Sequence, residues 1–125
     1  MEDIQIKLSV LWIATMLTYL LGDVLRIFSG DAKPGEMAGQ PAASWMWMVA
    51  AVLMLIPILM VVFSVFLDYP VNRWANIIVA TFFLLFNLIG IPSYPSMYDK
   101  FLLAVSLVFN GMVIWLAWNW VSTST

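Results

Sequence analysis

Long apolar stretches alternate with short polar breaks along this chain of 125 residues. A helix needs about 20 residues to cross a hydrocarbon core of about 30 Å, and four of the apolar stretches are close to that length. We expect four membrane-spanning helices, at residues 8–28, 44–67, 73–91 and 99–121. The pattern therefore predicts an all-α fold, an integral membrane four-helix bundle that forms a single transmembrane domain over residues 1–125.

The breaks between the apolar stretches are rich in turn-forming residues. The longest break, residues 29–43, contains Pro34-Gly35 as a turn signal and carries further glycine and proline that favour irregular backbone. Its unpaired amides require that it lie outside the hydrocarbon. The turn at residues 68–72 is short, which predicts that the second and third spans are antiparallel neighbours.

Capping and helix-breaking residues refine these boundaries. Ser44 and Asn72 are placed to cap the second and third spans, and Ser96 with Asp99 three residues later has the spacing of a capping box for the fourth. Pro57, in the middle of the second span, removes the hydrogen bond to the Leu53 carbonyl and predicts a kink. Pro57 is either a tolerated membrane-helix proline or a functional hinge.

Composition supports a membrane protein and removes several classes of function. Hydrophobic residues make up 64% of the chain and charged residues 10%, whereas soluble domains carry about a quarter charged residues. Without cysteine or histidine there is no thiol nucleophile and no ordinary neutral-pH base or metal ligand. The five basic residues are scattered, so nucleic acid is not expected as a partner. We expect no enzyme activity, no catalytic residue, no metal site and no cofactor.

A polar stripe follows one face of the first span, because its members recur at spacings of three and four residues: Trp12, Thr15, Tyr19, Asp23 and Arg26. Asp23 lies about 22 Å along the helix from Leu8, just inside the far edge of the core. The separation of three residues lets Asp23 and Arg26 pair. The pair is either an anchor for the helix end or part of a solute or proton site, since ionisable groups inside a membrane are often functional.

The third and fourth spans contain asparagine side chains. Asn76 and Asn87, eleven residues apart, lie close to the same face of the third span, and we expect interhelical hydrogen bonds from them, with the polar stripe as their candidate partner. Ser106 and Asn110 on the fourth span suit helix packing. Tryptophans crowd the end of that span and are expected to form an aromatic belt, the alternative being an aromatic cage for an organic cation: Trp115, Trp118 and Trp120.

Several segments together resemble a known family: residues 7–12, Tyr19 with residues 23–25, residues 71–78 and residues 114–120. The most specific parts are the Leu-Trp…Tyr…Asp pattern of the first span and Val-Asn-Arg-Trp-Ala-Asn at the start of the third. They resemble a family of small four-span bacterial membrane proteins of unknown function, over nearly the whole chain. Members often carry basic residues after the final tryptophans, where this chain has Asn119 and a Ser/Thr tail. The resemblance implies the architecture and supplies no activity.

The candidate ligand residues are the polar stripe with Asn76 and Asn87, and the preferred function is an oligomeric carrier or channel subunit for a small solute or ion. The alternative is a non-transporting scaffold that binds a membrane-protein partner or lipid. Small multidrug-resistance exporters are similar in size, but they centre on a buried glutamate in span one, and this span has none. The expected partners are the lipid bilayer and further copies of the chain.

The expected location is the inner or plasma membrane, as a multi-pass protein with both termini on one side. Two basic residues fall on the side of the termini and three on the other, so the positive-inside rule discriminates weakly. The acidic character of the longest loop favours cytoplasmic termini.

Overall fold

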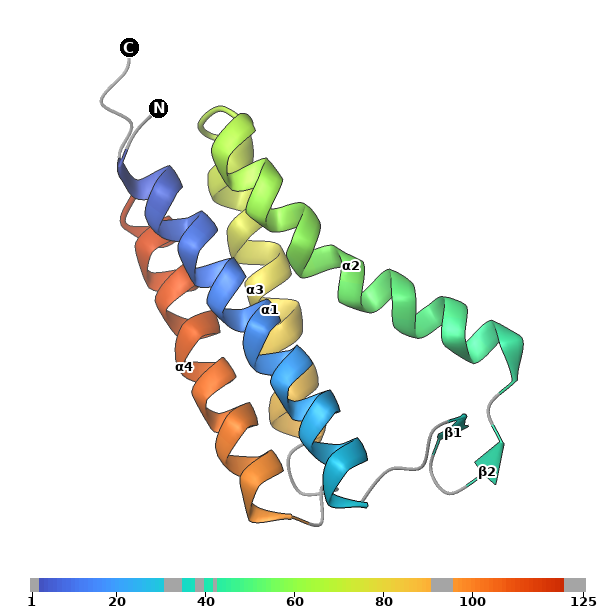
Figure 1. Ribbon diagram of the computed structural model, residues 1–125. Coiled ribbons are helices and arrows are strands. Elements are labelled where there is room, and N and C mark those ends of the chain that lie inside the picture. Colours follow the sequence, from blue (N-terminus) through green and yellow to red (C-terminus); the bar gives the residue numbers. More distant parts are fainter. Residues whose placement is uncertain (1–2, 31–34, 38–39, 42, 91–95, 121–125) are drawn as a thin grey trace.

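The structure is a computed structural model that describes residues 3–30, 35–37, 40–41, 43–90 and 96–120. Its elements are α1 (Asp3–Ser29), β1 (Glu36–Met37), β2 (Gln40–Pro41), α2 (Ser44–Phe66), α3 (Val71–Gly90) and α4 (Met97–Trp118). The predicted all-α bundle is confirmed (Figure 1). The long loop, expected to be irregular, contains one small regular feature, because β1 and β2 pair antiparallel with Glu36 opposite Pro41.

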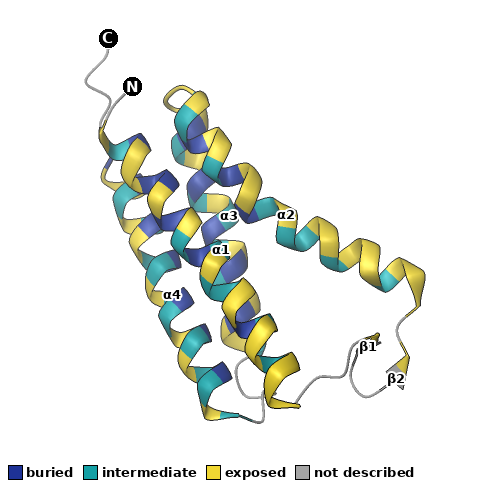
Figure 2. Cartoon of the chain, viewed as in Figure 1, coloured by how far each residue is buried: buried dark blue, intermediate teal, exposed yellow. Residues whose placement is uncertain are grey.

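Each of the four helices is long and apolar enough to cross a membrane, which indicates a multi-pass membrane protein. Figure 2 shows that exposed positions cover the outer faces of the helices while buried positions gather between them. Polar side chains are as common as hydrophobic ones among the buried positions of the described chain. This distribution suits a protein in lipid, where the outer surface has no need to be polar and polar groups are best paired inside.

Helix α1 packs against both α2 and α4, and α3 packs mainly against α4 (Figure 1). The described chain begins and ends at one end of the bundle, which we call the terminal end (Asp3 and Trp120). The opposite end, where α1 ends and α4 begins, is the loop end (Ser29 and Met97). Contact between α2 and α3 is slight, because the two helices diverge away from the turn that joins them.

Helix α2 changes direction near its middle, as the proline predicts (Figure 1). Its buried residues, Pro57, Met60 and Ser64, all lie in the half that follows the bend. The other half, from Ser44 to Ile56, leaves the bundle at the loop end. Since proline lacks an amide proton and its ring crowds the preceding turn, a bend at this position is expected.

The capping predictions are corrected by the structure. Ala43, not Ser44, is the N-cap of α2, and no side chain caps that end. Asn72 is not a cap, since α3 begins at Val71 and the Asn72 amide donates to the carbonyls of α2 and the following turn instead. Ser96 is the N-cap of α4 as expected, but its side chain makes no cap hydrogen bond, and Asp99 is paired with another helix. In each case a tertiary contact or a backbone shift replaces the local cap.

An amide network at the terminal end joins three helices. Asn76 Oδ1 accepts from the Trp12 indole at 2.7 Å and from the Ser64 hydroxyl at 3.3 Å, and Asn76 Nδ2 donates to Asn72 Oδ1 at 2.6 Å. We call these four residues the Asn76 network. All four side chains are fully buried. The interhelical hydrogen bonding expected of Asn76 is therefore confirmed.

Two more side chains of α1 form hydrogen bonds to the C-terminal end of α2, at the terminal end of the bundle. Gln5 Nε2 donates to the Leu67 carbonyl at 3.1 Å, and Ser9 Oγ donates to the Val61 carbonyl at 2.9 Å. These bonds reach only the half of α2 that follows Pro57. Helix α2 is thus held firmly at the terminal end, and its other half is free to diverge.

Replacing Asn76 by leucine tests the network. Asn76→Leu leaves the Trp12 indole N–H and the Ser64 hydroxyl buried without their acceptor, so we expect a loss of about 1–3 kcal/mol in unfolding free energy. Unfolding by a denaturing detergent in lipid bicelles measures this. Asn119→Leu, which removes an exposed amide that donates to the Trp115 carbonyl of its own helix, is the matched control and should change little. Equal losses in both variants would contradict a special role for the network.

Replacing Pro57 by alanine tests the cause of the bend. Pro57→Ala restores the missing amide proton, and the N-terminal half of α2 should move closer to α3. Because the chain has no cysteine, spin labels on cysteines introduced at the exposed positions Val52 and Leu85 report that distance by pulsed electron paramagnetic resonance. We expect a shorter distance in the alanine variant. An unchanged distance would assign the bend to packing around Met60 and Ser64.

Candidate functional site

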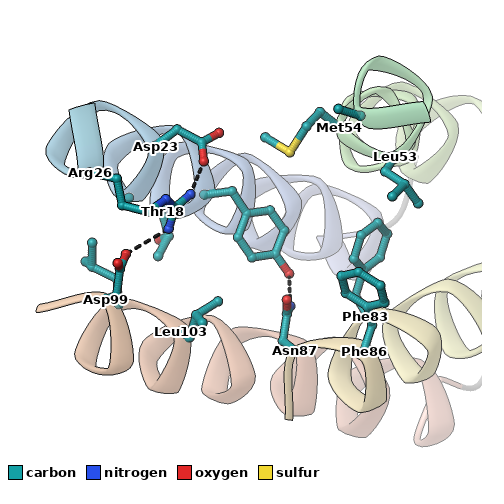
Figure 3. Close-up of a pocket in the computed structure, with 14 residues that line it drawn as sticks. Thr18, Asp23, Arg26, Leu53, Met54, Phe83, Phe86, Asn87, Asp99 and Leu103 are labelled. Carbon is teal, nitrogen blue, oxygen red and sulfur yellow. Dashed lines mark hydrogen bonds and ion pairs between the residues drawn. The ribbon is translucent and has the colours of Figure 1, made fainter. Parts of the chain in front are cut away.

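A cavity of about 240 Å³ lies at the loop end, on the side where α2 diverges from α3. All four helices line it (Figure 3). Its polar lining is Thr18, Tyr19, Asp23 and Arg26 from α1, Asn87 from α3 and Asp99 from α4. The remaining lining is apolar or glycine: Gly22, Ala50, Leu53, Met54, Phe83, Phe86, Leu102 and Leu103. An apolar pocket with a few convergent polar groups is the usual form of a small-molecule site.

Three charged side chains meet at one side of this cavity, and we call them the charged cluster (Asp23, Arg26 and Asp99). Arg26 Nη1 donates to Asp99 Oδ1 at 2.7 Å, and Arg26 Nη2 donates to Asp23 Oδ1 (Figure 3). The predicted Asp23–Arg26 pair is confirmed. The pairing with Asp99 was missed, because the spacing from Ser96 suggested a cap and nothing local connects residues 73 positions apart.

The members of the charged cluster differ in exposure. The side chain of Asp23 is 47% exposed, that of Arg26 23% and that of Asp99 1%. Asp99 Oδ2 has no hydrogen-bond partner among the described residues and is buried. Asp99 lies in the first turn of α4, where the helix dipole favours a negative charge. A buried charged oxygen without a partner is nevertheless costly in a low-dielectric interior.

A hydrogen-bonded pair borders the cavity on its inner side. Asn87 Nδ2 donates to Tyr19 Oη at 2.5 Å, which joins α3 to α1. Ser106 and Asn110 of α4 approach the same hydroxyl. Both polar atoms of the Asn110 amide are buried and lack a hydrogen-bond partner in the described chain. The amides and hydroxyls of three helices therefore converge next to the cavity wall.

The structure divides the predicted stripe into two groups. Tyr19, Asp23 and Arg26 line the cavity, and Asn87 joins them. Trp12 belongs to the Asn76 network, and the Thr15 hydroxyl donates to the Leu11 carbonyl of its own helix, so neither reaches the cavity.

An aromatic side chain separates the two groups. The Phe83 ring lies 6.4 Å from the Trp12 ring and 6.1 Å from the Tyr19 ring, measured between centroids. Phe83 is buried, so it is an apolar barrier between the cavity and the Asn76 network.

Two tryptophans at the terminal end, Trp74 and Trp118, contact a cation of the chain itself. The Arg73 guanidinium lies 4.8 Å from the Trp74 ring centroid and 5.4 Å from that of Trp118. It also donates to the carbonyls of Ala117 and Trp118 at the end of α4. Arg73 thus occupies the place that an organic cation would take in an aromatic cage at this end.

No group of three or more acidic, histidine or cysteine side chains within the described ranges is arranged to hold a metal ion. The cavity instead combines apolar walls, two carboxylates and one guanidinium. Such a lining suits reversible binding of a small molecule or ion by charge and shape.

Removing the charges one at a time should separate their structural roles. Arg26→Gln leaves the buried Asp99 without its counter-ion, and we expect a loss of about 3–5 kcal/mol in unfolding free energy. Asp23→Asn affects a half-exposed pair and should cost under about 1 kcal/mol. Unfolding in bicelles measures both. Lys100→Gln, at the same end of the bundle, serves as control, since Lys100 forms no ion pair within the described residues. A larger loss for Asp23→Asn than for Arg26→Gln would contradict the assignment.

A family model matches the chain over residues 1–125, and its description is a family of unknown function. No curated protein matches the chain. No solved structure matches it either. The architecture and the full-length match agree with the family resemblance of the four spans, and the chain belongs to DUF6326, a family of unknown function.

Proposed function

We propose that this protein is a carrier or channel subunit for a small solute or ion, and that the solute binds in the cavity beside the charged cluster. The main support is the cavity of about 240 Å³ with three ionisable side chains in an otherwise apolar helix bundle. Charged groups within membrane helices are costly and commonly mark solute or ion pathways. An anchor for the helix ends would need one ion pair, whereas this cluster has an additional carboxylate.

The arrangement of α2 supports access to the cavity. The N-terminal half of α2 borders the cavity through Ala50, Leu53 and Met54 and has few contacts with α3. Movement of this half about the bend at Pro57 would widen or narrow the cavity at the loop end. Phe83 and the Asn76 network close the terminal end. A carrier would need these barriers to open in turn, and a proline bend is a suitable pivot.

We also propose that the protein forms homo-oligomers in the inner or plasma membrane, with both termini in the cytoplasm. The N-terminal half of α2 exposes apolar side chains away from the bundle, including Met48, Val49 and Val52. A second copy packing there would cover these exposed apolar side chains. The same exposed surface favours the alternative function, a scaffold that binds another membrane protein or lipid without transport.

Reconstitution into lipid vesicles tests the proposed function. Uptake of a labelled alkylammonium, a labelled carboxylate and a labelled polyol is compared between protein-containing and empty vesicles. We expect at least one of them to enter faster with the wild type and to lose most of that advantage in Asp99→Asn. Asp68→Asn, the same change at an exposed turn position, is the matched control. If none enters faster, while a second membrane protein or an ordered lipid copurifies in mild detergent, the scaffold function is supported instead.

A further inference from the structure

We infer that the cavity binds a monovalent organic cation with an apolar body, in competition with a proton on Asp99. This inference shares its cavity with the proposed function and names the class of solute. It follows from the charge balance of the cluster, from the unpartnered oxygen of Asp99 and from the apolar walls.

The charged cluster has more negative than positive charge. Arg26 is bonded to both carboxylates, one on its own helix and one on α4. With both carboxylates ionised, the cluster carries a net charge of −1. A net charge in a low-dielectric cavity is unfavourable, and binding of one positive charge removes it. The site is therefore complementary to a single monovalent cation.

Asp99 Oδ2 is the position for a proton. It is buried and has no partner within the described ranges, and a proton is small enough to bind there without additional space. Among the described residues, the charged groups in the cavity lining are the three members of the cluster, and Tyr19 is the one other titratable group there. Lining residues from α2 and α3 are uncharged. Within the described lining, no basic side chain besides Arg26 is present to pair with Asp99 Oδ2 in place of the proton.

Asp23 is the position for the organic cation. Its side chain is half exposed and lines the cavity, so a ligand can reach its carboxylate. With the proton on Asp99, Arg26 neutralises Asp23 and little attraction for a cation remains. When Asp99 has lost its proton, the two carboxylates share one guanidinium, and the net negative charge of the cluster attracts the cation. Arg26 thus couples the two binding events, although they occur at different carboxylates.

The walls select a ligand with an apolar body. Beyond the charged cluster the cavity is lined by Leu53, Met54, Phe83 and Phe86, among others. Aromatic faces attract cations. The volume of about 240 Å³ is below the range of about 300 to 1,000 Å³ that is usual for ligand pockets, so the ligand has to be small. An alkylammonium or a single aromatic ring bearing a quaternary ammonium fits this description.

Anionic solutes are a worse match. An anion would have to compete with two carboxyl groups for the one guanidinium, because Arg26 is already bonded to both Asp23 and Asp99. The exchange that we propose balances: the cation enters the cavity, the Asp99 O–H bond breaks, and the proton passes to water. The charge of the cavity is zero before and after.

Binding of benzyltrimethylammonium to the purified full-length chain in lipid nanodiscs tests the inference. Phenylacetate, similar in size and opposite in charge, is the comparison ligand. For the wild type we expect saturable binding of the cation, weaker binding at mildly acidic pH, and no saturable binding of phenylacetate. Asp99→Asn imitates the protonated carboxyl, so its cation affinity should fall by about tenfold or more and lose its pH dependence. Asp68→Asn should behave as the wild type.

A double variant reverses the charge and gives a result that a structural role would not produce. Asp23→Asn with Asp99→Asn removes both carboxylates that Arg26 pairs with, so the cavity should lose benzyltrimethylammonium binding and gain phenylacetate binding. If this variant does not fold, as judged by size exclusion, the half-exposed Asp23→Asn single variant replaces it. That variant should also lose cation affinity by about tenfold. An unchanged cation affinity in the folded variants would overturn the inference.

Proton release completes the test. Calorimetry in buffers with different ionisation enthalpies should show that cation binding releases protons in the wild type and none in Asp99→Asn. Cation binding without proton release and without pH dependence would overturn the competition. If the cation binds but does not cross vesicle membranes, the inference stands and the proposed transport fails. If the labelled carboxylate or polyol crosses and the cation does not bind, the transport stands and the inference fails.

Discussion

Hydrocarbon offers no hydrogen bonds, so the polar side chains of this bundle have to find partners inside the protein, and the rest of the structure depends on how they do so. Two clusters meet this requirement. The Asn76 network joins α1, α2 and α3 near the terminal end. The charged cluster joins α1 to α4 at the loop end. With these polar groups inside the bundle, the outer faces of the helices are largely apolar and exposed, as contact with lipid requires.

The uneven distribution of these contacts explains why there is a cavity. Within the part of the chain that the structure describes, hydrogen bonds from α2 to its neighbours all lie after Pro57, at Ser64 and at the carbonyls that accept from Gln5, Ser9 and Asn72. Its first half has no comparable bond in the described structure and leaves the bundle. The opening lies beside the charged cluster, where Asp99 keeps one carboxylate oxygen unpartnered. The proposed site therefore exists because the first half of α2 does not pack closely against the other helices.

The positions of the helices, and contacts between residues of the same helix, were predictable from the sequence. The four helices follow from apolar length, the bend follows from Pro57, and the Asp23–Arg26 pair follows from a spacing of three residues. The roles of Asn76 and Asn87 in bonds to the first helix were also predictable, because an amide in a span needs a partner. Asp99 was not, since its distance of three residues from Ser96 matched a capping pattern. In the folded chain Asp99 pairs instead with the Arg26 guanidinium of another helix.

The sequence by itself determined the class of the protein, the number of its helices and the identity of its few intramembrane polar groups, because these depend on local hydropathy and helical spacing. Only the tertiary structure decided which polar groups share a site. It divided the stripe of α1 at Phe83, placed Thr15 outside the cavity and brought Asp99 to Arg26. The physical reason is that pairing across helices depends on their crossing and rotation. Those are set by the packing of all four helices together, which no local pattern contains.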